Sequence, residues 1–185
     1  MWMEVNIVFN ENRLYITIAL PGRNYFKPDQ LMYRDIVEKL PYKSSFLFVD
    51  NISSLNEEGV TGDYTLKKEA FFYEDHFAGN PVTPGVIITE IMAQIGLVVL
   101  GIFLVVRSPN GFMTGAEGGL LPLLTSTDIS FFKMVLPGEK VTVVSKKQYF
   151  RFSKLKCYVE MIDAAGEIVA KGMISGFIKQ IRHNK

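Results

Sequence analysis

Residues 76–106, HFAGNPVTPGVIITEIMAQIGLVVLGIFLVV, join a loop rich in glycine and proline to a long apolar run. The loop begins at His76, and the run contains one carboxylate, Glu90, and one carboxamide, Gln94. A helix is expected from about residue 84 to residue 106, because proline fits the first turn of a helix and the following run is long and apolar. A helix that is apolar on nearly every side is typical of the buried centre of a fold.

This run is also the one segment that suggests a transmembrane helix. Its uninterrupted apolar part, Ile95–Val106, is shorter than the ~20 residues that a spanning helix needs. Glu90 and Gln94 lie inside the run, and a carboxylate in the middle of a bilayer is costly. We therefore expect a buried core helix and no membrane span.

Apolar-rich runs on both sides of this helix predict strands. They are a hairpin at Val5–Phe9 and Leu14–Leu20, then Phe46–Ile52, Val60–Leu66, Leu123–Lys133, Lys140–Phe152, Lys154–Ile162 and Glu167–Ile178. A short helix is expected at Pro28–Leu40. Many strands and one long helix predict an α+β fold, in a single domain over 1–185, with the sheet wrapped around the helix.

Composition narrows the function classes. The net charge of +1 argues against a general nucleic-acid binder, and the apolar content of 48% argues against disorder. The single cysteine, Cys157, excludes an internal disulfide and fits a reducing compartment, so we interpret it as a small core residue. The N-terminus has neither a basic region nor a small-residue cleavage site, so no secretory signal is indicated and a cytoplasmic protein is expected.

Glu90 and Gln94 are four residues apart and are therefore neighbours on one face of the expected helix. On the same projection Gly101 lies between their directions two turns further on. A buried carboxyl is costly unless it is neutralised or hydrogen-bonded, and Gln94 is placed to bond Glu90. The spacing fits a catalytic carboxyl and a structural pair joining helix to sheet equally well.

His76 taken alone is more often a surface or core histidine than a catalyst. Its loop favours function, because glycine and proline constrain the backbone and the loop opens onto a helix N-terminus. The first N–H groups of that helix, near Gly85 and Val86, can bind a developing negative charge. An imidazole and a carboxyl that meet in a dry pocket are the usual means of moving protons.

Four segments together resemble bacterial 3-hydroxyacyl-acyl-carrier-protein dehydratases, a family with the hotdog fold. The longest is His76-Phe-Ala-Gly-Asn-Pro-Val-Thr-Pro-Gly-Val-Ile-Ile-Thr-Glu-Ile-Met-Ala-Gln94. The others are Leu40-Pro-Tyr-Lys-Ser-Ser-Phe-Leu-Phe-Val-Asp50, Glu69-Ala-Phe-Phe-Tyr-Glu-Asp-His76 and Asp128-Ile-Ser-Phe-Phe-Lys-Met-Val-Leu-Pro-Gly138. The likeness covers roughly residues 33–180 and leaves the hairpin at 1–22 outside.

The resemblance implies a role for each site residue. His76 would be the general base and Glu90 the acid, on different subunits of a homodimer. The N–H groups of Gly85 and Val86 would bind the substrate carbonyl, and Gln94 would hold Glu90. A glutamate at position 90 resembles the branch that only dehydrates. The implied chemistry uses no cofactor and no metal.

The chain departs from the family pattern at several positions. Ala78 and Thr83 replace the usual proline and methionine, and Asp75 replaces a common glycine. Tyr42, Lys43 and Ser45 replace the family's histidine, arginine and proline. Both proton-transfer positions are intact, so we expect altered loop stiffness or substrate preference.

A basic stretch follows the Pro-Gly segment. Lys146, Lys147, Arg151 and Lys154 form a candidate docking patch for an acidic acyl-carrier protein, as the resemblance implies; the alternative is a solvated sheet face. The leading hypothesis is a dehydratase that acts on carrier-bound 3-hydroxyacyl chains, in fatty-acid or related polyene synthesis. The alternatives are a thioesterase on the same fold and a non-catalytic acyl-binding subunit.

Overall fold

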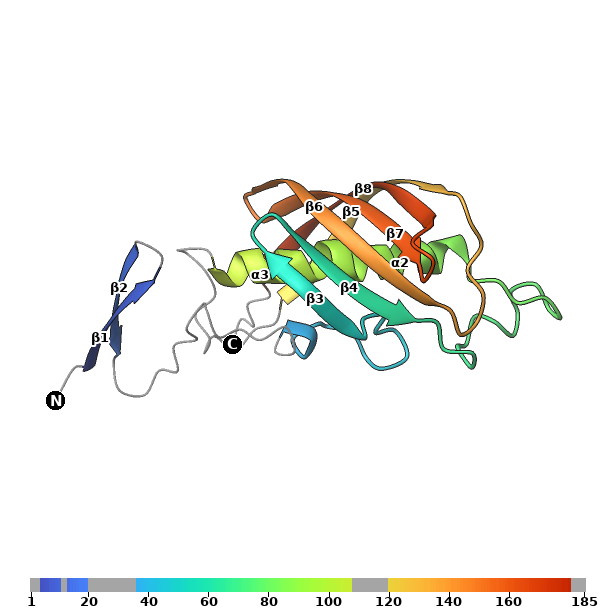
Figure 1. Cartoon of the computed structure of the whole chain (residues 1–185), viewed down its shortest axis with the longest axis horizontal. Coiled ribbons are helices and arrows are strands. Elements are labelled where there is room, and N and C mark those ends of the chain that lie inside the picture. Colours follow the sequence, from blue (N-terminus) through green and yellow to red (C-terminus); the bar gives the residue numbers. More distant parts are fainter. Residues whose placement is uncertain (1–3, 11–12, 20–35, 108–119, 181–185) are drawn as a thin grey trace.

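The computed structural model describes residues 4–10, 13–19, 36–107 and 120–180. Its main body is a curved antiparallel sheet wrapped around one long helix (Figure 1), which confirms the expected α+β architecture. The strands are β3 (Asn51–Asn56), β4 (Gly59–Thr65), β5 (Leu120–Phe131), β6 (Lys140–Arg151), β7 (Lys154–Asp163) and β8 (Ile168–Gln180). They lie in the order β3-β4-β6-β7-β8-β5, so β3 and β5 form the two edges.

The N-terminal hairpin is also confirmed. Strand β1 (Glu4–Asn10) pairs with β2 (Arg13–Ala19) in a sheet of its own. The short helix expected at Pro28–Leu40 lies mostly outside the described residues. Of that segment Ile36 and Val37 are helical, and a turn closed by the Leu40 N–H to Val37 O bond follows.

Alternating side chains turn one face of each long strand toward the helix. In β7 the inward side chains are Leu155, Cys157, Val159 and Met161, all fully buried. Cys157 is thus a core residue, as expected, and burial raises the pKa of its thiol to about 11. A neutral thiol of this kind packs as a small apolar side chain.

The central helix runs from Gly85 to Arg107 and confirms the expected core helix to within one residue at each end. It is long and apolar enough to cross a membrane, but 83% of its most apolar window is buried inside the protein. Glycines let the helix approach the sheet closely. A Cβ at Gly96 would lie 3.0 Å from a methyl of Val159, and one at Gly62 would lie 2.9 Å from Ile95.

The middle of this helix is wider than an α-helix. Between α2 (Gly85–Ala93) and α3 (Leu100–Arg107), residues Gln94–Val99 form a π-helix, η2. The Ser145 hydroxyl of β6 donates to the Gly96 carbonyl at 2.8 Å. A π-turn takes more residues than an α-turn, so positions after it rotate away from an ideal helical wheel. The projection of Gly101 toward the Glu90–Gln94 face was therefore wrong, and Gly101 faces Ile178 of β8.

The prediction of one strand was partly wrong. The expected strand at Phe46–Ile52 begins only at Asn51, and the preceding segment is irregular. The Phe46 carbonyl and the Phe48 N–H bond the Gln94 side chain, and the segment meets strand β4 only at its end, where the Asp50 N–H donates to Asp63 O.

The two edges of the sheet differ in chemistry. Edge strand β3 carries exposed asparagine and serine side chains and a register shift between Ile52 and Ser54. Edge strand β5 exposes large apolar side chains, namely Leu121, Leu123, Leu124 and Phe131. A polar, bulged edge resists pairing with another strand, whereas a long apolar edge invites it.

Candidate active site

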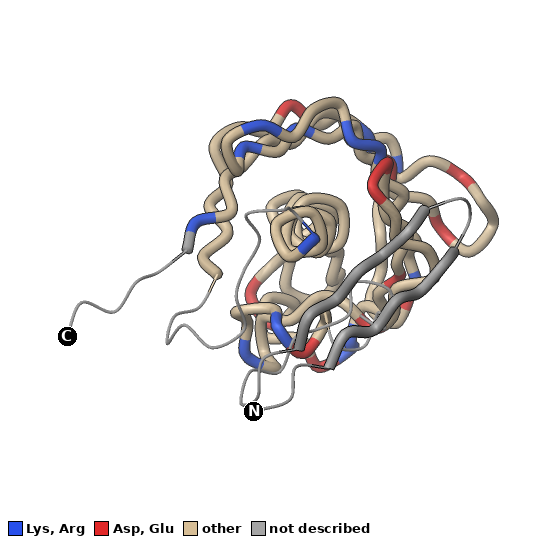
Figure 2. The backbone as a smooth tube through the Cα atoms, turned by 90° about the vertical axis from the view of Figure 1, so that its left-hand side faces the viewer, with Lys and Arg blue, Asp and Glu red and all other residues tan. Residues whose placement is uncertain are grey.

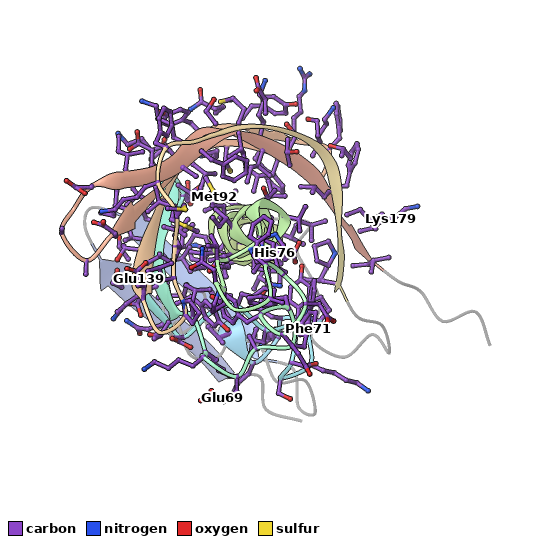
Figure 3. All side chains as sticks on the ribbon, turned by 90° about the vertical axis from the view of Figure 1, so that its right-hand side faces the viewer. Glu69, Phe71, His76, Met92, Glu139 and Lys179 are labelled. Atoms are coloured by element: carbon purple, nitrogen blue, oxygen red, sulfur yellow. The ribbon has the colours of Figure 1, made fainter. Side chains whose placement is uncertain are left out.

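His76 lies on the loop that precedes α2, and Figure 3 shows it at the N-terminal end of the helix. Its Nδ1 atom is 2.8 Å from the carbonyl oxygen of Val82. A carbonyl can only accept, so Nδ1 carries the proton and Nε2 is left with its lone pair. When the imidazole is neutral, this bond therefore leaves Nε2 as the nitrogen that can take a proton.

The next residue holds the ring of His76 from one side. Phe77 has a positive φ of 61°, which a bulky residue rarely adopts, and its ring centroid lies 4.2 Å from that of His76. The turn closes through the Asn80 N–H, which donates to Phe77 O at 2.8 Å. Backbone strain next to a candidate catalytic group is typical of functional loops.

The far end of the loop is fixed to the core. The hydroxyls of Tyr73 and Thr83 are 2.6 Å apart in a buried pair, and Thr83 N–H donates to Val135 O at 2.8 Å. Burial raises the pKa of Tyr73, so its hydroxyl stays protonated. Thr83, where the resembled family often has methionine, therefore contributes two hydrogen bonds that stiffen the loop.

The first turn of α2 offers two backbone donors. Ile87 and Ile88 donate to Pro84 O at 2.9 and 3.0 Å, whereas the N–H groups of Gly85 and Val86 have no acceptor among the described residues. The ring of Phe131 lies over Gly85, at 3.4 Å from the position of a Cβ. Unpaired N–H groups at a helix N-terminus bind negative charge.

Glu90 and Gln94 form the pair that the spacing indicated. Gln94 is fully buried, and its Nε2 donates to Glu90 Oε1 at 2.8 Å and to Phe46 O at 2.8 Å. Its Oε1 accepts from the Phe48 N–H at 2.8 Å. Gln94 therefore links the Glu90 carboxyl to the irregular segment that precedes β3.

Tyr42 is the neighbour that sequence reasoning missed as a site residue. Its ring packs against the core, with its centroid 6.3 Å from that of Phe46. Burial and then the negative charge of Glu90 raise the pKa of Tyr42 above its ordinary value. Position 42 and position 90 are far apart in sequence, so no local spacing could have revealed this electrostatic influence.

His76 and Glu90 do not bond to each other within the described part of the chain. His76 contacts Val82 and Phe77, whereas Glu90 contacts Gln94. One chain thus holds each group separately in a fixed orientation. No cluster of three His, Cys, Asp or Glu side chains in the described ranges is arranged to hold a metal ion.

The four residues of the candidate docking patch do not share one environment. Lys147 is half-buried and pairs with Glu58 at 3.2 Å. Arg151 and Lys154 lie at the β6–β7 turn, over the rings of Phe152 and Phe177. Lys146 is exposed on β6 and lies opposite Tyr158 of β7.

The β6–β7 turn lies at the α3 end of the subunit. Leu155, the residue after Lys154, lies 3.5 Å from the position of a Cβ on Gly101 in α3. Figure 2, which views that end, shows lysines and arginines along the arc of the sheet. The candidate docking patch is thus at the opposite end of the helix from His76.

Comparison with known proteins places these features in a family. Residues 40–174 match the FabA-like domain, a span that includes His76, Gly85, Glu90 and Gln94. The chain belongs to the FabA-like family. A 3-hydroxyacyl-[acyl-carrier-protein] dehydratase FabZ of Caldicellulosiruptor saccharolyticus is 33% identical over 150 residues, covering 78% of this chain and 96% of the relative. The FabZ dehydratase of Petrotoga mobilis is 29% identical, covering 73% and 93%.

Solved structures share the fold at low sequence identity. The dehydratase heterocomplex ApeI:P from Xenorhabdus doucetiae superimposes with a TM-score of 0.61 at 12% identity, covering 77% of this chain and 90% of that one. A mutant thioesterase from Pseudomonas aeruginosa gives a TM-score of 0.54 at 8% identity, covering 82% and 96%. These neighbours confirm the hotdog fold, which serves both dehydratases and thioesterases.

Proposed function

We propose that this protein removes water from 3-hydroxyacyl thioesters carried on acyl-carrier protein and gives trans-2-enoyl thioesters. The observation that carries the proposal is the His76 Nδ1–Val82 O hydrogen bond, because it leaves a basic Nε2 beside a helix N-terminus. Membership of the FabA-like family and the FabZ relatives support the same reaction. Hydrolysis of a thioester gives no comparable role to a histidine on this loop.

The proposed reaction assigns one step to each group. Nε2 of His76 takes a proton from C2 of the acyl chain, next to the thioester carbonyl. The N–H groups of Gly85 and Val86 stabilise the charge on that carbonyl oxygen, which is worth ~3 kcal/mol per well-placed donor. Glu90 gives its proton to the C3 hydroxyl as the C3–O bond breaks, so that water leaves and a C2–C3 double bond forms. Return of the proton from His76 to Glu90 completes the cycle.

We further propose that the working enzyme is a homodimer, with His76 and Glu90 of each site on different subunits. The exposed apolar edge of β5 supports pairing between two copies. An edge strand has unpaired backbone N–H and C=O groups, and these can bond to a strand of another chain. Antiparallel pairing of the two β5 strands about a twofold axis would bring the α3 end of one subunit beside the α2 end of its partner.

The same pairing supports the candidate docking patch. Lys146, Arg151 and Lys154 lie at or toward the α3 end and would therefore face the side of the dimer that carries the partner's loop. An acidic carrier protein bound there could reach the site between the subunits. Lys147 is the weakest member, since Glu58 already neutralises it. The free thiol of Cys157 and the enclosed central helix support a cytoplasmic location.

Hydration of a 2-enoyl thioester, the reverse reaction, tests the proposal directly. The wild-type protein should hydrate the substrate reversibly, and His76→Ala should lower the rate by at least about a hundredfold, since a general base contributes that much. His183→Ala, which removes the other of the two histidines, is the matched control and should keep full activity.

Three results would contradict the proposed reaction or its mechanism. Release of free thiol without hydration would identify a thioesterase. Binding of the thioester without either reaction would identify an acyl-binding subunit. Full hydration by His76→Ala would remove His76 from the mechanism while leaving the reaction intact.

A further inference from the structure

The hydroxyl of Tyr42, which the charge of Glu90 influences, has no hydrogen-bond partner among the described residues. The hydroxyls of Tyr73 and Tyr158 are both engaged, by Thr83 and Glu160 respectively. The Tyr42 hydroxyl makes no hydrogen bond with any described residue, although the rest of its side chain packs against the core. A phenylalanine ring would pack against the core equally well, so packing does not explain the hydroxyl.

The second carboxyl oxygen of Glu90 also lacks a hydrogen-bond partner among the described residues. Gln94 bonds Oε1, whereas Oε2 has no hydrogen-bond partner within the described ranges. No sealed polar side-chain atom in those ranges lacks a partner, so both the Tyr42 hydroxyl and Glu90 Oε2 must border open space. Each of these two atoms is therefore open to a further hydrogen bond.

The backbone around Tyr42 is tied to the same carboxyl. The Tyr42 ring lies 6.3 Å from Phe46, the Phe46 carbonyl accepts from Gln94, and Gln94 donates to Glu90. These contacts fix the irregular segment relative to the carboxyl through side-chain bonds. Burial, and then the charge of Glu90, raise the pKa of Tyr42, so the phenol stays a donor at working pH.

We propose that Tyr42 is a positioning residue for the proton donor, and that its hydroxyl donates a hydrogen bond to Glu90 Oε2 when that oxygen becomes charged. The inference rests on the proposed dehydratase function. In the elimination, Glu90 passes its proton to the departing hydroxyl and becomes a carboxylate. A donor held in place for that charge stabilises the transition state more than the ground state. In hydration the same bond holds the carboxylate that takes a proton from water.

Tyr42→Phe tests this role, because it removes the hydroxyl and keeps the ring. In the dehydration direction, where Glu90 becomes charged only as the hydroxyl leaves, a hydrogen bond to a charged group predicts that kcat falls about ten- to a hundredfold, with KM for the 3-hydroxyacyl thioester unchanged within about twofold. Tyr149→Phe, which removes an exposed hydroxyl on β6, is the matched control and should leave both constants unchanged. Thermal unfolding of Tyr42→Phe should match that of the wild type.

A double-mutant cycle with Glu90→Gln separates positioning from packing. If Tyr42 acts through the carboxyl, Tyr42→Phe should cause no further loss in single-turnover rate once Glu90 is replaced. An equal loss in both backgrounds, or a rise in KM with unchanged kcat, would overturn the proposal. If Glu90→Gln leaves no measurable rate, the kcat and KM of the single variant Tyr42→Phe decide. A fall in kcat alone supports positioning, and a rise in KM alone contradicts it.

The outcomes distinguish this inference from the function on which it rests. A wild-type protein that does not hydrate enoyl thioesters would contradict the dehydratase proposal itself. An active wild type with an equally active Tyr42→Phe would contradict only the role of Tyr42. Tyr42→His, which introduces the residue type of the resembled family, should recover part of the lost kcat because histidine can also donate.

Discussion

Both hydrogens of the Gln94 amide and one lone pair of its oxygen are engaged in hydrogen bonds. The partners are Glu90 Oε1, Phe46 O and Phe48 N, each at 2.8 Å. A fully buried carboxamide would be costly without partners, and here each bond also fixes a neighbour. Gln94 therefore has two roles, since it orients the candidate acid and replaces strand pairing for the segment before β3.

Replacement of Gln94 by leucine should reduce both stability and activity. The buried Phe48 N–H would have no partner and the part-buried Phe46 carbonyl would lose its donor, and an unsatisfied buried group costs about 1–3 kcal/mol. We expect the free energy of unfolding to fall by about 2–4 kcal/mol in denaturant titration, and hydration activity to fall with it. Gln148→Leu on the exposed side of β6 is the matched control. An unchanged denaturation midpoint for Gln94→Leu would show that its bonds are weaker than their geometry implies.

At the scale of elements, the long strands were predictable and the irregular parts were not. Apolar-rich runs identified β6, β7 and β8, because each strand buries much of its apolar content against the helix. The segment before β3 has the apolar content of a strand, but its backbone bonds go to Gln94, a tertiary contact that no local pattern contains. The π-helix was missed because periodicity assumes a uniform turn.

The β6–β7 turn is the element on which carrier-protein docking can be tested. Arg151→Glu combined with Lys154→Glu should raise KM for a carrier-bound substrate about tenfold at low salt, since opposite charges speed and stabilise association. A small enoyl thioester should react with the same variant at the wild-type rate. Equal losses with both substrates would mean that the turn supports the fold and not docking.

At the scale of the molecule, the two edges of the sheet suggest how copies assemble. The polar, bulged β3 edge opposes pairing, and the apolar β5 edge favours it. The candidate groups agree with such an assembly. Within the described residues of one chain, His76 and Glu90 have separate partners and do not bond to each other. Sequence could identify the groups from motif and spacing, but a site shared between chains depends on the assembly.

Mixing two inactive variants tests whether sites are shared. If His76 of one subunit works with Glu90 of the other, co-folded His76→Ala and Glu90→Gln chains should recover about a quarter of wild-type activity. Half of the dimers would then be mixed, each with one intact site of two. Hydration measured before and after co-refolding checks this expectation. No recovery, with mixed dimers demonstrated by mass, would place both groups of a site on one chain.

The bond between Phe48 N–H and the Gln94 carboxamide has a spectroscopic consequence. That amide hydrogen is protected by a side chain of the helix and not by a ladder partner. Its exchange with deuterated solvent therefore requires the irregular segment to detach from the helix, which would also release the support of Glu90. The exchange rate of this single amide is a direct reporter of how often the candidate acid loses its orientation.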